Sequence, residues 1–493
     1  MTAAIISRCT LLLLAVGLTV AVLAPAAEIN LPDIGSPADA TLSRNDEAQL
    51  GRAIMRQIRN SGRVVEDPLV NEYVNEIGHR IAAQANSDGI HDFSFFVIED
   101  PAINAFALPG GFIAVHTGLL EATRSEDELA GVLAHEISHV TQRHIARAIH
   151  SGRRQSIMSM AIMLGAILAA VAGADGDAVQ GAIAIAQGTA AQQQINFTRS
   201  NEYEADRVGI SALANAGFDP QGMASFFEVI SRSNTPMEFR TPEFLRTHPV
   251  SSARIAEARN RARSYPPVHT SDTVNYGVAR ARILVASKST SEEAVRYFER
   301  EPYEYQSDVE RYGRAVAYLR HGRNAEANTI FEELANKDPK VIAYHIGLAD
   351  AQLAMEAIDE SVATFESARE LFPRNVPLVI HYAEALLKLG HAQKAHEILL
   401  DLLNNVPPTP EQVRLIARAA IAAGETAEAH YYMAEYRFII GDLVGGVNFL
   451  RQALQVPELE EIQRIRFESR IDFIREFMTE EQLAQMSRSR SIG

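Results

Sequence analysis

The chain has 493 residues, of which 47% are hydrophobic, and this length is enough for about three domains that each bury a core. The formal net charge of -16 argues against a nucleic-acid partner, because binding to phosphates requires a basic surface. The acidic balance otherwise favours solubility and says little about the fold.

The N-terminal segment, 1–26, has the pattern of a secretory signal peptide. Arg8 gives a weakly positive start, an apolar run extends from Leu11 to Leu23, and APAAE predicts cleavage after Ala26. The run is short for a membrane span, and the only cysteine, Cys9, precedes it, whereas a lipoprotein cysteine would follow it. We therefore expect a mature chain without disulfide bonds in a bacterial periplasm, with an uncleaved membrane anchor as the less favoured alternative.

The next part of the chain predicts helices and a small sheet. An extended segment at residues 27–44 is followed by helical spacing of apolar residues up to about Ala85. FSFFVIE, from Phe93 to Glu99, predicts a strand, and a Pro-Gly-Gly turn beyond it predicts a strand pair. The stretch from Asn104 to Leu108 has the character of an edge strand, to which an extended substrate could add by backbone hydrogen bonds; an ordinary core strand is the alternative.

Residues 125–150 predict one long helix that contains the sequence HEISHV. His135 and His139 are four residues apart and share a face, so both imidazoles can reach one zinc ion at about 2 Å. Glu136 lies about 100° further around the helix, where it can take a proton from zinc-bound water. By itself the motif is also compatible with three polar residues that lie close together by chance.

A second helix is predicted from about Ser200 to Ala216, and it carries NEYEADRVG. Glu202 and Asp206 share one face of it. Because a catalytic zinc typically takes three protein ligands, we expect Glu202 to be the third ligand and the chain to bind one zinc ion. Asp206 is expected to accept a hydrogen bond from the outer nitrogen of a ligating histidine, His135 in the first place. A solvated acidic face is the alternative.

Small residues border both of these helix faces. They are Gly131, Ala134 and Ser138 on the first helix and Ala205, Gly209, Ala212 and Ala216 on the second. Ligands on two helices can share one ion only if the helices are close. We therefore expect the small residues to let the two backbones approach each other.

Residues 156–195 are rich in alanine, glycine, isoleucine, methionine and glutamine. Asp175 and Asp177 interrupt the apolar character, and the first apolar stretch is near the lower length limit for a membrane span. We expect two buried or mobile helices around a Gly-Asp turn, with peripheral membrane contact as the alternative.

The C-terminal part of the chain repeats itself with a period of about 34 residues. The positions that keep this step are Pro339, Pro373 and Pro407, then Phe331, Phe365 and Leu399, and the small residues Ala327, Ser361, Ala395 and Ala429. Paired helices with this period resemble tetratricopeptide repeats, which stack into a solenoid with a concave surface for protein partners. Generic helical hairpins are the alternative.

Several motifs together resemble one family, the gluzincin zinc proteases of the HtpX-like and CAAX-prenyl type. They are HEISHV, NEYEADRVG, the upstream NAFALPGGFIAVHTGLL and the later THPVSSARI. The resemblance covers roughly residues 45–265, and each motif is weak without the others. It implies a mostly helical α+β metallopeptidase domain with a small sheet, followed here by an α-solenoid of repeats.

The resemblance also singles out three further residues. His248 of THP matches a histidine that lies near the zinc, where it would either take the fourth coordination position and displace the water or stabilise the developing oxyanion. A loop histidine before proline is the alternative. Arg254 is expected close to the same site, with its role open. His144 is expected to be structural, because five residues after His139 it would face elsewhere on the helix.

These features divide the chain into six parts. We expect a signal peptide at 1–26, an extended segment at 27–44, a zinc metallopeptidase domain at 45–265, a linker with connecting helices at 266–305, a repeat domain at 306–480 and a flexible tail at 481–493.

The predicted activity is zinc-dependent hydrolysis of peptide bonds in the periplasm. Glu136 would accept the proton of the attacking water and deliver it to the leaving amine. The resemblance implies misassembled outer-membrane proteins as substrates and the outer-membrane β-barrel assembly machinery as a partner of the repeats. An assembly factor or chaperone with a largely latent zinc site, and a membrane-associated quality-control protease, are the alternatives.

Overall fold

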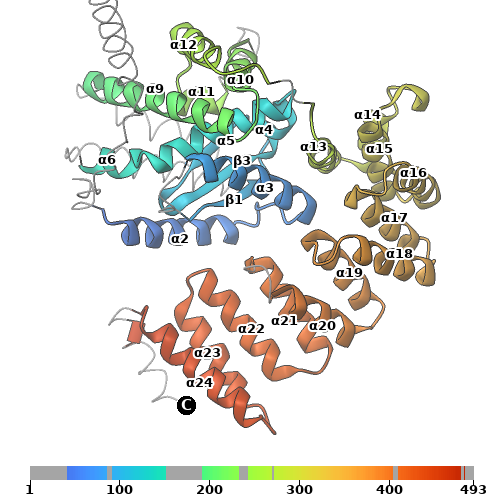
Figure 1. Cartoon of the computed structure of the whole chain (residues 1–493). Helices are drawn as coiled ribbons and strands as arrows, with labels where there is room; N and C mark the ends of the chain where they lie inside the picture. The colour runs from blue at the N-terminus through green and yellow to red at the C-terminus, as the bar shows by residue number, and fades with distance from the viewer. Residues whose placement is uncertain are drawn as a thin grey trace, which may run out of the picture.

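The computed structural model describes most of the chain in two groups of elements (Figure 1). The described residues are 42–85, 92–150, 191–232, 242–268, 271–403, 409–478 and 482–483, with 191–198 described as backbone only. The first group, in blue to green, surrounds a small sheet with helices, and the second, in yellow to red, is a curved stack of helices. The expected fold class, mostly helical with a small sheet, is confirmed.

Several predicted segments lie outside the described residues. They are the signal peptide, most of the extended segment at 27–44, the apolar residues 156–190 and nearly all of the tail. Among the helices that the structure describes, none is both long enough and apolar enough to cross a membrane.

Two helices before the sheet confirm the helical spacing of the sequence. Helix α2 (Arg44–Asn60) begins at Ser43, whose side chain accepts a hydrogen bond from the backbone of Asp46 in a capping box. Helix α3 (Pro68–Ala85) packs its apolar face against the sheet and against helices α5 and α9, described below. Ile81 on this face is fully buried.

The sheet has three strands in the order β1-β3-β2. They are β1 (Ser94–Ile98), β2 (Ala105–Ala107) and β3 (Phe112–His116). Strand β3 pairs parallel with β1 and antiparallel with β2, across the turn η2 (Pro109–Gly111). Gly111 has a φ of 84°, and a Cβ there would lie 2.0 Å from the carbonyl oxygen of Asp92, so the turn requires glycine. The strand pair is confirmed, and within the described chain β2 is an edge strand.

The long helix expected at residues 125–150 is wrong, because it is broken into two helices. After α4 (Thr117–Ala122), helix α5 (Glu126–Thr141) ends and α6 (His144–His150) starts in a new direction. Arg143 between them has a φ of 52°, a left-handed conformation that costs about 1–2 kcal/mol in a residue with a Cβ. Its guanidinium is buried against the carboxylate of Glu47 at 3.2 Å and donates to the carbonyl of Leu42 at 2.9 Å, which offsets this cost.

The small residues on α5 approach two different helices. The elements after α6 are α9 (Ala191–Asn215), α10 (Gln221–Arg232), α11 (Glu243–Thr247) and α12 (Ser252–Ala262). A Cβ on Gly209 of α9 would lie 3.0 Å from the carbonyl oxygen of Ala134, so Gly209 lets α9 and α5 touch. A Cβ on Gly131 would instead lie 2.7 Å from the backbone of Met223 in α10. The expectation is therefore confirmed for Gly209 and wrong for Gly131, which serves the α5–α10 contact.

The second group begins with connecting elements and continues as helix pairs. The connecting elements are α13 (Val274–Ala286), α14 (Ser291–Phe298) and η3 (Tyr303–Tyr305). The pairs are α15 (Asp308–His321) with α16 (Asn324–Lys337), α17 (Ile342–Ala354) with α18 (Ile358–Leu371), α19 (Val376–Lys388) with α20 (Ala392–Leu403), α21 (Pro410–Ala422) with α22 (Thr426–Ile439), and α23 (Leu443–Leu454) with α24 (Glu461–Arg475). The first four pairs start at equal steps along the chain, which confirms the period, and the fifth departs from it.

The repeated positions of the sequence form the core of these pairs. Phe331, Phe365 and Leu399 are fully buried, each on the second helix of its pair. Ser361, at the small-residue position, is also buried, and its hydroxyl donates to the carbonyl of Ala349 on the preceding helix at 2.8 Å. The spacing in sequence therefore reflects one packing arrangement repeated along the stack.

The later helix pairs contact α2 and α3 through polar groups, and Figure 1 shows them alongside these helices. The contacts include Arg59 with Glu411 at 3.6 Å, Arg56 with the carbonyl of Gly441 at 2.7 Å, Arg414 with Glu66 at 2.9 Å and Asn375 with Glu72 at 3.3 Å. The two ion pairs among these contacts, of Arg59 and of Arg414, are partly exposed and contribute little stability, about 0–1 kcal/mol each.

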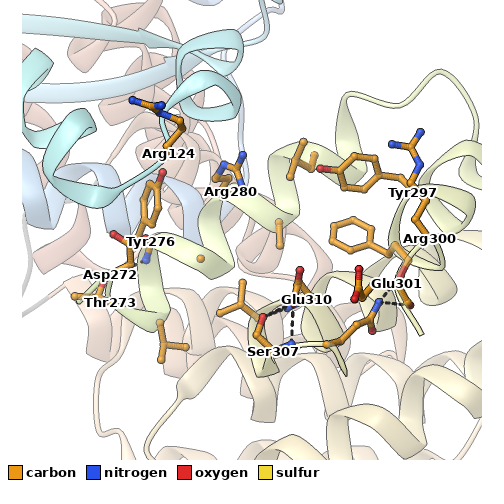
Figure 2. A pocket seen from close by; sticks show the side chains of 17 residues that line it. Arg124, Asp272, Thr273, Tyr276, Arg280, Tyr297, Arg300, Glu301, Ser307 and Glu310 are labelled. Atoms are coloured by element: carbon orange, nitrogen blue, oxygen red, sulfur yellow. Dashed lines mark hydrogen bonds between the residues drawn. The ribbon is translucent and has the colours of Figure 1, made fainter. Parts of the chain in front are cut away.

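A pocket of about 570 Å³ lies where the connecting helices meet the first pair (Figure 2). Tyr276 and Arg280 of α13 line it, together with Ser307 and Glu310 at the start of α15 and Arg124 before α5. None of the residues that line it belongs to the histidine group described next.

Candidate metal centre and active site

Three helical elements bring four side chains with metal-ligating atoms together. His135 and His139 come from α5, Glu202 from α9, and His248 directly follows α11. One ligand atom from each lies within 4.8 Å of those of the other three, and the group is largely buried. Helix α5 can hold it because its neighbouring residues Leu133 and Ile137 are fully enclosed in the core.

The distances between these atoms fit a tetrahedral zinc site. Nε2 of His135 lies 3.1 Å from Nε2 of His139 and 3.3 Å from Nδ1 of His248. The carboxylate of Glu202 lies 3.4 Å from the first, 3.5 Å from the second and 3.2 Å from the third of these nitrogens. Two ligands of a tetrahedral zinc are about 3.3 Å apart when each is about 2.0–2.1 Å from the ion. Three nitrogens and one carboxylate are also a donor set that zinc accepts.

The charge states of His139 and Glu202 suit a cation. Burial alone would lower the pKa of His135, but Asp206 and Glu202 outweigh it and raise that pKa to about 10, so a metal would have to displace a proton from this imidazole. Burial lowers the pKa of His139 well below its usual value, which keeps this imidazole neutral. Burial alone would raise the pKa of Glu202, but His248 and His135 outweigh it and hold that pKa well below its usual value. Neutral imidazole and ionised carboxylate are the forms that bind metal.

Glu136 is buried beside these side chains and points toward His248. Its Oε1 lies 3.4 Å from Nε2 of His248, and no group in the described part of the chain donates a hydrogen bond to that oxygen. The backbone N–H of Ala107 faces the carboxylate and lowers its pKa slightly. Burial raises the pKa of Glu136, and a carboxylate with a raised pKa is a better proton acceptor.

Asp206 and Arg254 hold the outer side of the site. Oδ1 of Asp206 lies 2.9 Å from Nδ1 of His135, on the outer nitrogen where the sequence places it. Arg254 donates to both oxygens of Asp206 and, from Nη1, to Oε2 of Glu202 at 2.9 Å. Sequence reasoning placed Arg254 near the site but left its role open, because only the fold shows that one guanidinium bridges both carboxylates.

The expectation that His144 faces away from the site is wrong. Because the chain turns at Arg143, Nδ1 of His144 lies 2.9 Å from Nδ1 of His139. Its Nε2 lies 3.2 Å from the carboxylate of Glu204, which also accepts a hydrogen bond from Arg147 at 2.9 Å. Burial lowers the pKa of His144 to about 4. Glu204 lies within NEYEADRVG but was not singled out there, and Arg147 belongs to none of the quoted motifs.

Strand β2 borders the site with its unpaired edge. The carbonyl of Asn104 and the N–H of Leu108 bond to β3, so Ala105 and Ala107 between them turn their backbone groups the other way. The N–H of Ala107 reaches Glu136 on that side. The unpaired edge and the general-base candidate are therefore neighbours.

Helix α11 closes over the site. The N–H of Phe244 donates to the carbonyl of Ile103 at 3.2 Å, two residues before Ala105 and on the same side of the strand. The N–H of His248 donates to the carbonyl of Phe244 at 2.7 Å, and the two rings are 4.8 Å apart. This short segment therefore covers the strand edge and places His248 among the ligand atoms.

Comparisons with known proteins agree with this geometry. Residues 68–262 match the profile of Peptidase family M48, and residues 352–419 match that of a tetratricopeptide repeat. The chain is 34% identical over 453 residues to the β-barrel assembly-enhancing protease of Escherichia coli K12, covering 90% of this chain and 91% of that one. It is 36% identical over 451 residues to the Vibrio cholerae counterpart, covering 90% and 92%.

Among solved structures, a tetratricopeptide repeat protein of Thermus thermophilus matches with 20% identity and a TM-score of 0.24, covering 40% of this chain and 98% of that one. The two profile matches and the length of the matches to relatives cover both the histidine group and the helix pairs. The chain therefore belongs to the M48 family of metallopeptidases, together with the β-barrel assembly-enhancing proteases.

Proposed function

We propose that this protein is a periplasmic zinc endopeptidase that hydrolyses misassembled or unfolded proteins, outer-membrane proteins in particular. The observation that carries the proposal is the buried group of His135, His139 and Glu202, at zinc-ligand spacing, beside the Glu136 oxygen that accepts no hydrogen bond from the described part of the chain. A buried carboxylate oxygen without a hydrogen-bond partner calls for an explanation, and a role as proton acceptor supplies one.

In the proposed reaction, His135, His139 and Glu202 hold one zinc ion per chain. When bound, zinc supplies Lewis acidity that polarises the peptide carbonyl and activates water. Glu136 takes the proton from the attacking water and passes it to the leaving amine, for which its buried carboxylate and raised pKa are suited. Asp206 keeps the proton of His135 on Nδ1, so that Nε2 is free to bind the metal.

His248 makes this form of the enzyme latent. Its Nδ1 lies at ligand spacing from His135 and Glu202, where it would be a fourth ligand of a bound metal, and its Nε2 faces Glu136. A group in that place takes the position that water needs. The fourth-ligand role therefore has more support than the oxyanion role, which would leave His248 turned toward a substrate carbonyl.

Substrate binding would require α11 and the adjoining His248 to move. An extended chain would add to the unpaired edge of β2 at Ala105 and Ala107, which places its backbone next to Glu136. The backbone N–H of Phe244 already donates a hydrogen bond to the carbonyl of Ile103 along that edge. Release of α11 would free the strand edge and remove His248 in one step.

The helix pairs dock protein partners, and the names of the relatives suggest the outer-membrane β-barrel assembly machinery. Those names and the signal-peptide pattern both favour the periplasm. We assign the catalytic domain to residues 45–265, the linker to 266–305 and the repeats to 306–480. Peripheral membrane contact would rest on residues 156–195 and awaits a test of liposome binding.

An assembly factor with a largely latent zinc site is the second candidate function. The closed position of His248 favours it, because a site held shut cleaves rarely. The two functions are compatible in one protein if partner binding decides when α11 opens.

Zinc content measured alongside casein hydrolysis tests the proposal. The mature protein, Glu136→Gln and His248→Ala should all bind about one zinc per chain, because His135, His139 and Glu202 remain in each. Hydrolysis should be lost in Glu136→Gln and raised in His248→Ala. The absence of stoichiometric zinc in the mature protein would refute the proposal, and unchanged hydrolysis in His248→Ala would refute latency alone.

A further inference from the structure

The Nδ1 atoms of His135 and His139, the two histidines of HEISHV, have different partners. Nδ1 of His135 faces a carboxylate, that of Asp206, which Arg254 fixes in turn. Nδ1 of His139 faces another imidazole, that of His144, at 2.9 Å. The side chain of His139 is 14% exposed and that of His135 fully buried, so packing alone restrains His139 less.

The hydrogen bonds from His139 through His144 to Glu204 determine which ring nitrogen of each histidine carries a proton. If Nε2 of His139 binds a metal, its proton must be on Nδ1, which then donates to Nδ1 of His144. That nitrogen must accept, so the proton of His144 is on Nε2. Nε2 then donates to Oε2 of Glu204 at 3.2 Å, and the same oxygen also accepts a hydrogen bond from Arg147 at 2.9 Å. Every donor has an acceptor only in this one arrangement of protons.

We propose that His144, oriented by Glu204, is a positioning residue that fixes the ring and the tautomer of His139 and so strengthens metal binding. The inference rests on the proposed metal site. It assigns a purpose to the break between α5 and α6: on an unbroken helix, residues five apart point about 140° away from each other, and His144 could not reach His139. The buried contact of Arg143 with Glu47 holds the chain in the turn that allows it.

Zinc affinity measured by competition with a chromophoric chelator tests this inference. Four proteins are compared at neutral pH: the mature chain, His144→Ala, His144→Asn, and His391→Ala as a control that removes an exposed histidine from the repeats. Loss of an outer partner of a metal-binding histidine weakens metal binding by about 10- to 100-fold, and we expect this for His144→Ala. His144→Asn should recover much of the loss, because its Oδ1 can accept from Nδ1 of His139.

The outcomes separate the inference from the proposed function. If the mature protein binds zinc tightly and His144→Ala binds it as tightly as His391→Ala, the positioning role is wrong and the metal site stands. If the mature protein binds no zinc, the metal site fails and the positioning role fails with it. If His144→Ala and His144→Asn lose zinc affinity equally, and both metal-free variants melt at the same temperature below that of the mature chain, His144 only supports the fold.

The tautomers give a second readout that does not depend on activity. In ¹⁵N-histidine spectra of the zinc-loaded protein, His144 should carry its proton on Nε2 and His139 on Nδ1, with the His144 signals assigned by their loss in His144→Asn. In Glu204→Gln the side-chain oxygen can still accept this proton, so the tautomer should persist while zinc affinity falls less than in His144→Ala. A proton on Nδ1 of His144 would overturn the inference.

Discussion

Arg254 donates two parallel hydrogen bonds to Asp206, from Nε at 2.8 Å and from Nη2 at 2.7 Å. Its third nitrogen donates to Glu202 at 2.9 Å, so one guanidinium joins the proposed third ligand to the partner of the first. The group is almost wholly buried, and its planar fork matches the carboxylate in a way that lysine cannot. We therefore expect Arg254 to affect both the stability of the metal-free site and the geometry of the site with a metal bound.

Replacing Arg254 should destabilise the metal-free protein strongly. Arg254→Ala leaves two buried carboxylates without their cation, and breaking a buried pair in this way typically costs about 3–5 kcal/mol. Zinc should recover part of the loss, because the ion neutralises Glu202. Urea unfolding with and without zinc measures both effects. Arg254→Lys retains the charge and should lose less; an unchanged midpoint in Arg254→Ala would show that the pair contributes nothing.

A large side chain at Gly209 should lower zinc content. A Cβ at this position already lies 3.0 Å from the carbonyl oxygen of Ala134, so the rest of a leucine would push α9 away from α5. Glu202 on α9 would then move out of reach of the two histidines. Metal analysis of Gly209→Leu checks this, with Arg207→Leu on the exposed face of the same helix as the control. Full zinc in both variants would contradict it.

The contact between α3 and the repeats should weaken as the pH rises. Burial, with Glu76 nearby, raises the pKa of Glu72 to about 7, although Asn375 on α19 hydrogen-bonds to its carboxylate. A carboxyl with a raised pKa in the folded state contributes stability that is complete below its unfolded pKa and is lost as pH rises toward about 7.

Thermal melting between pH 5 and pH 8 tests this dependence. Glu72→Gln mimics the neutral carboxyl, so it should raise the melting temperature at the higher pH and flatten the profile. Glu66→Gln, which removes an exposed carboxylate from the same interface, should leave the slope in place. Parallel profiles for Glu72→Gln and the unaltered protein would mean that Glu72 does not titrate in this range.

Truncating the repeat core should spare the metal site. Phe331 is fully buried, 5.7 Å from the ring of Tyr312, and its ring fills the space beside Gly347. Phe331→Ala should cost about 3–5 kcal/mol in the repeats while zinc content stays the same, because no residue of the histidine group touches it. Calorimetry and metal analysis measure the two quantities. A parallel loss of zinc would show that the two parts of the chain fold as one unit.

Local periodicity in the sequence was sufficient to predict the pairs of candidate site residues and the helix repeats. Spacings of four residues put His135 with His139, and Glu202 with Asp206, on shared helix faces, and the structure brings the two faces together. The constant step between repeated residues predicted the period of the first four helix pairs, because these pairs repeat the same packing. These features are set by backbone geometry within one or two helices, which sequence spacing encodes directly.

Other features depended on contacts between residues far apart in the chain. The turn at Arg143 is held by Glu47, which lies far earlier in the sequence, and it alone brings His144 onto His139. The bridge from Arg254 to Asp206 and Glu202, and the approach of Gly131 to Met223, likewise join separate helices. The sequence by itself determined the two pairs of candidate site residues and the repeats, through short-range helical geometry. Only the tertiary structure decided which groups contact those residues from behind, because that depends on which distant groups burial brings into contact.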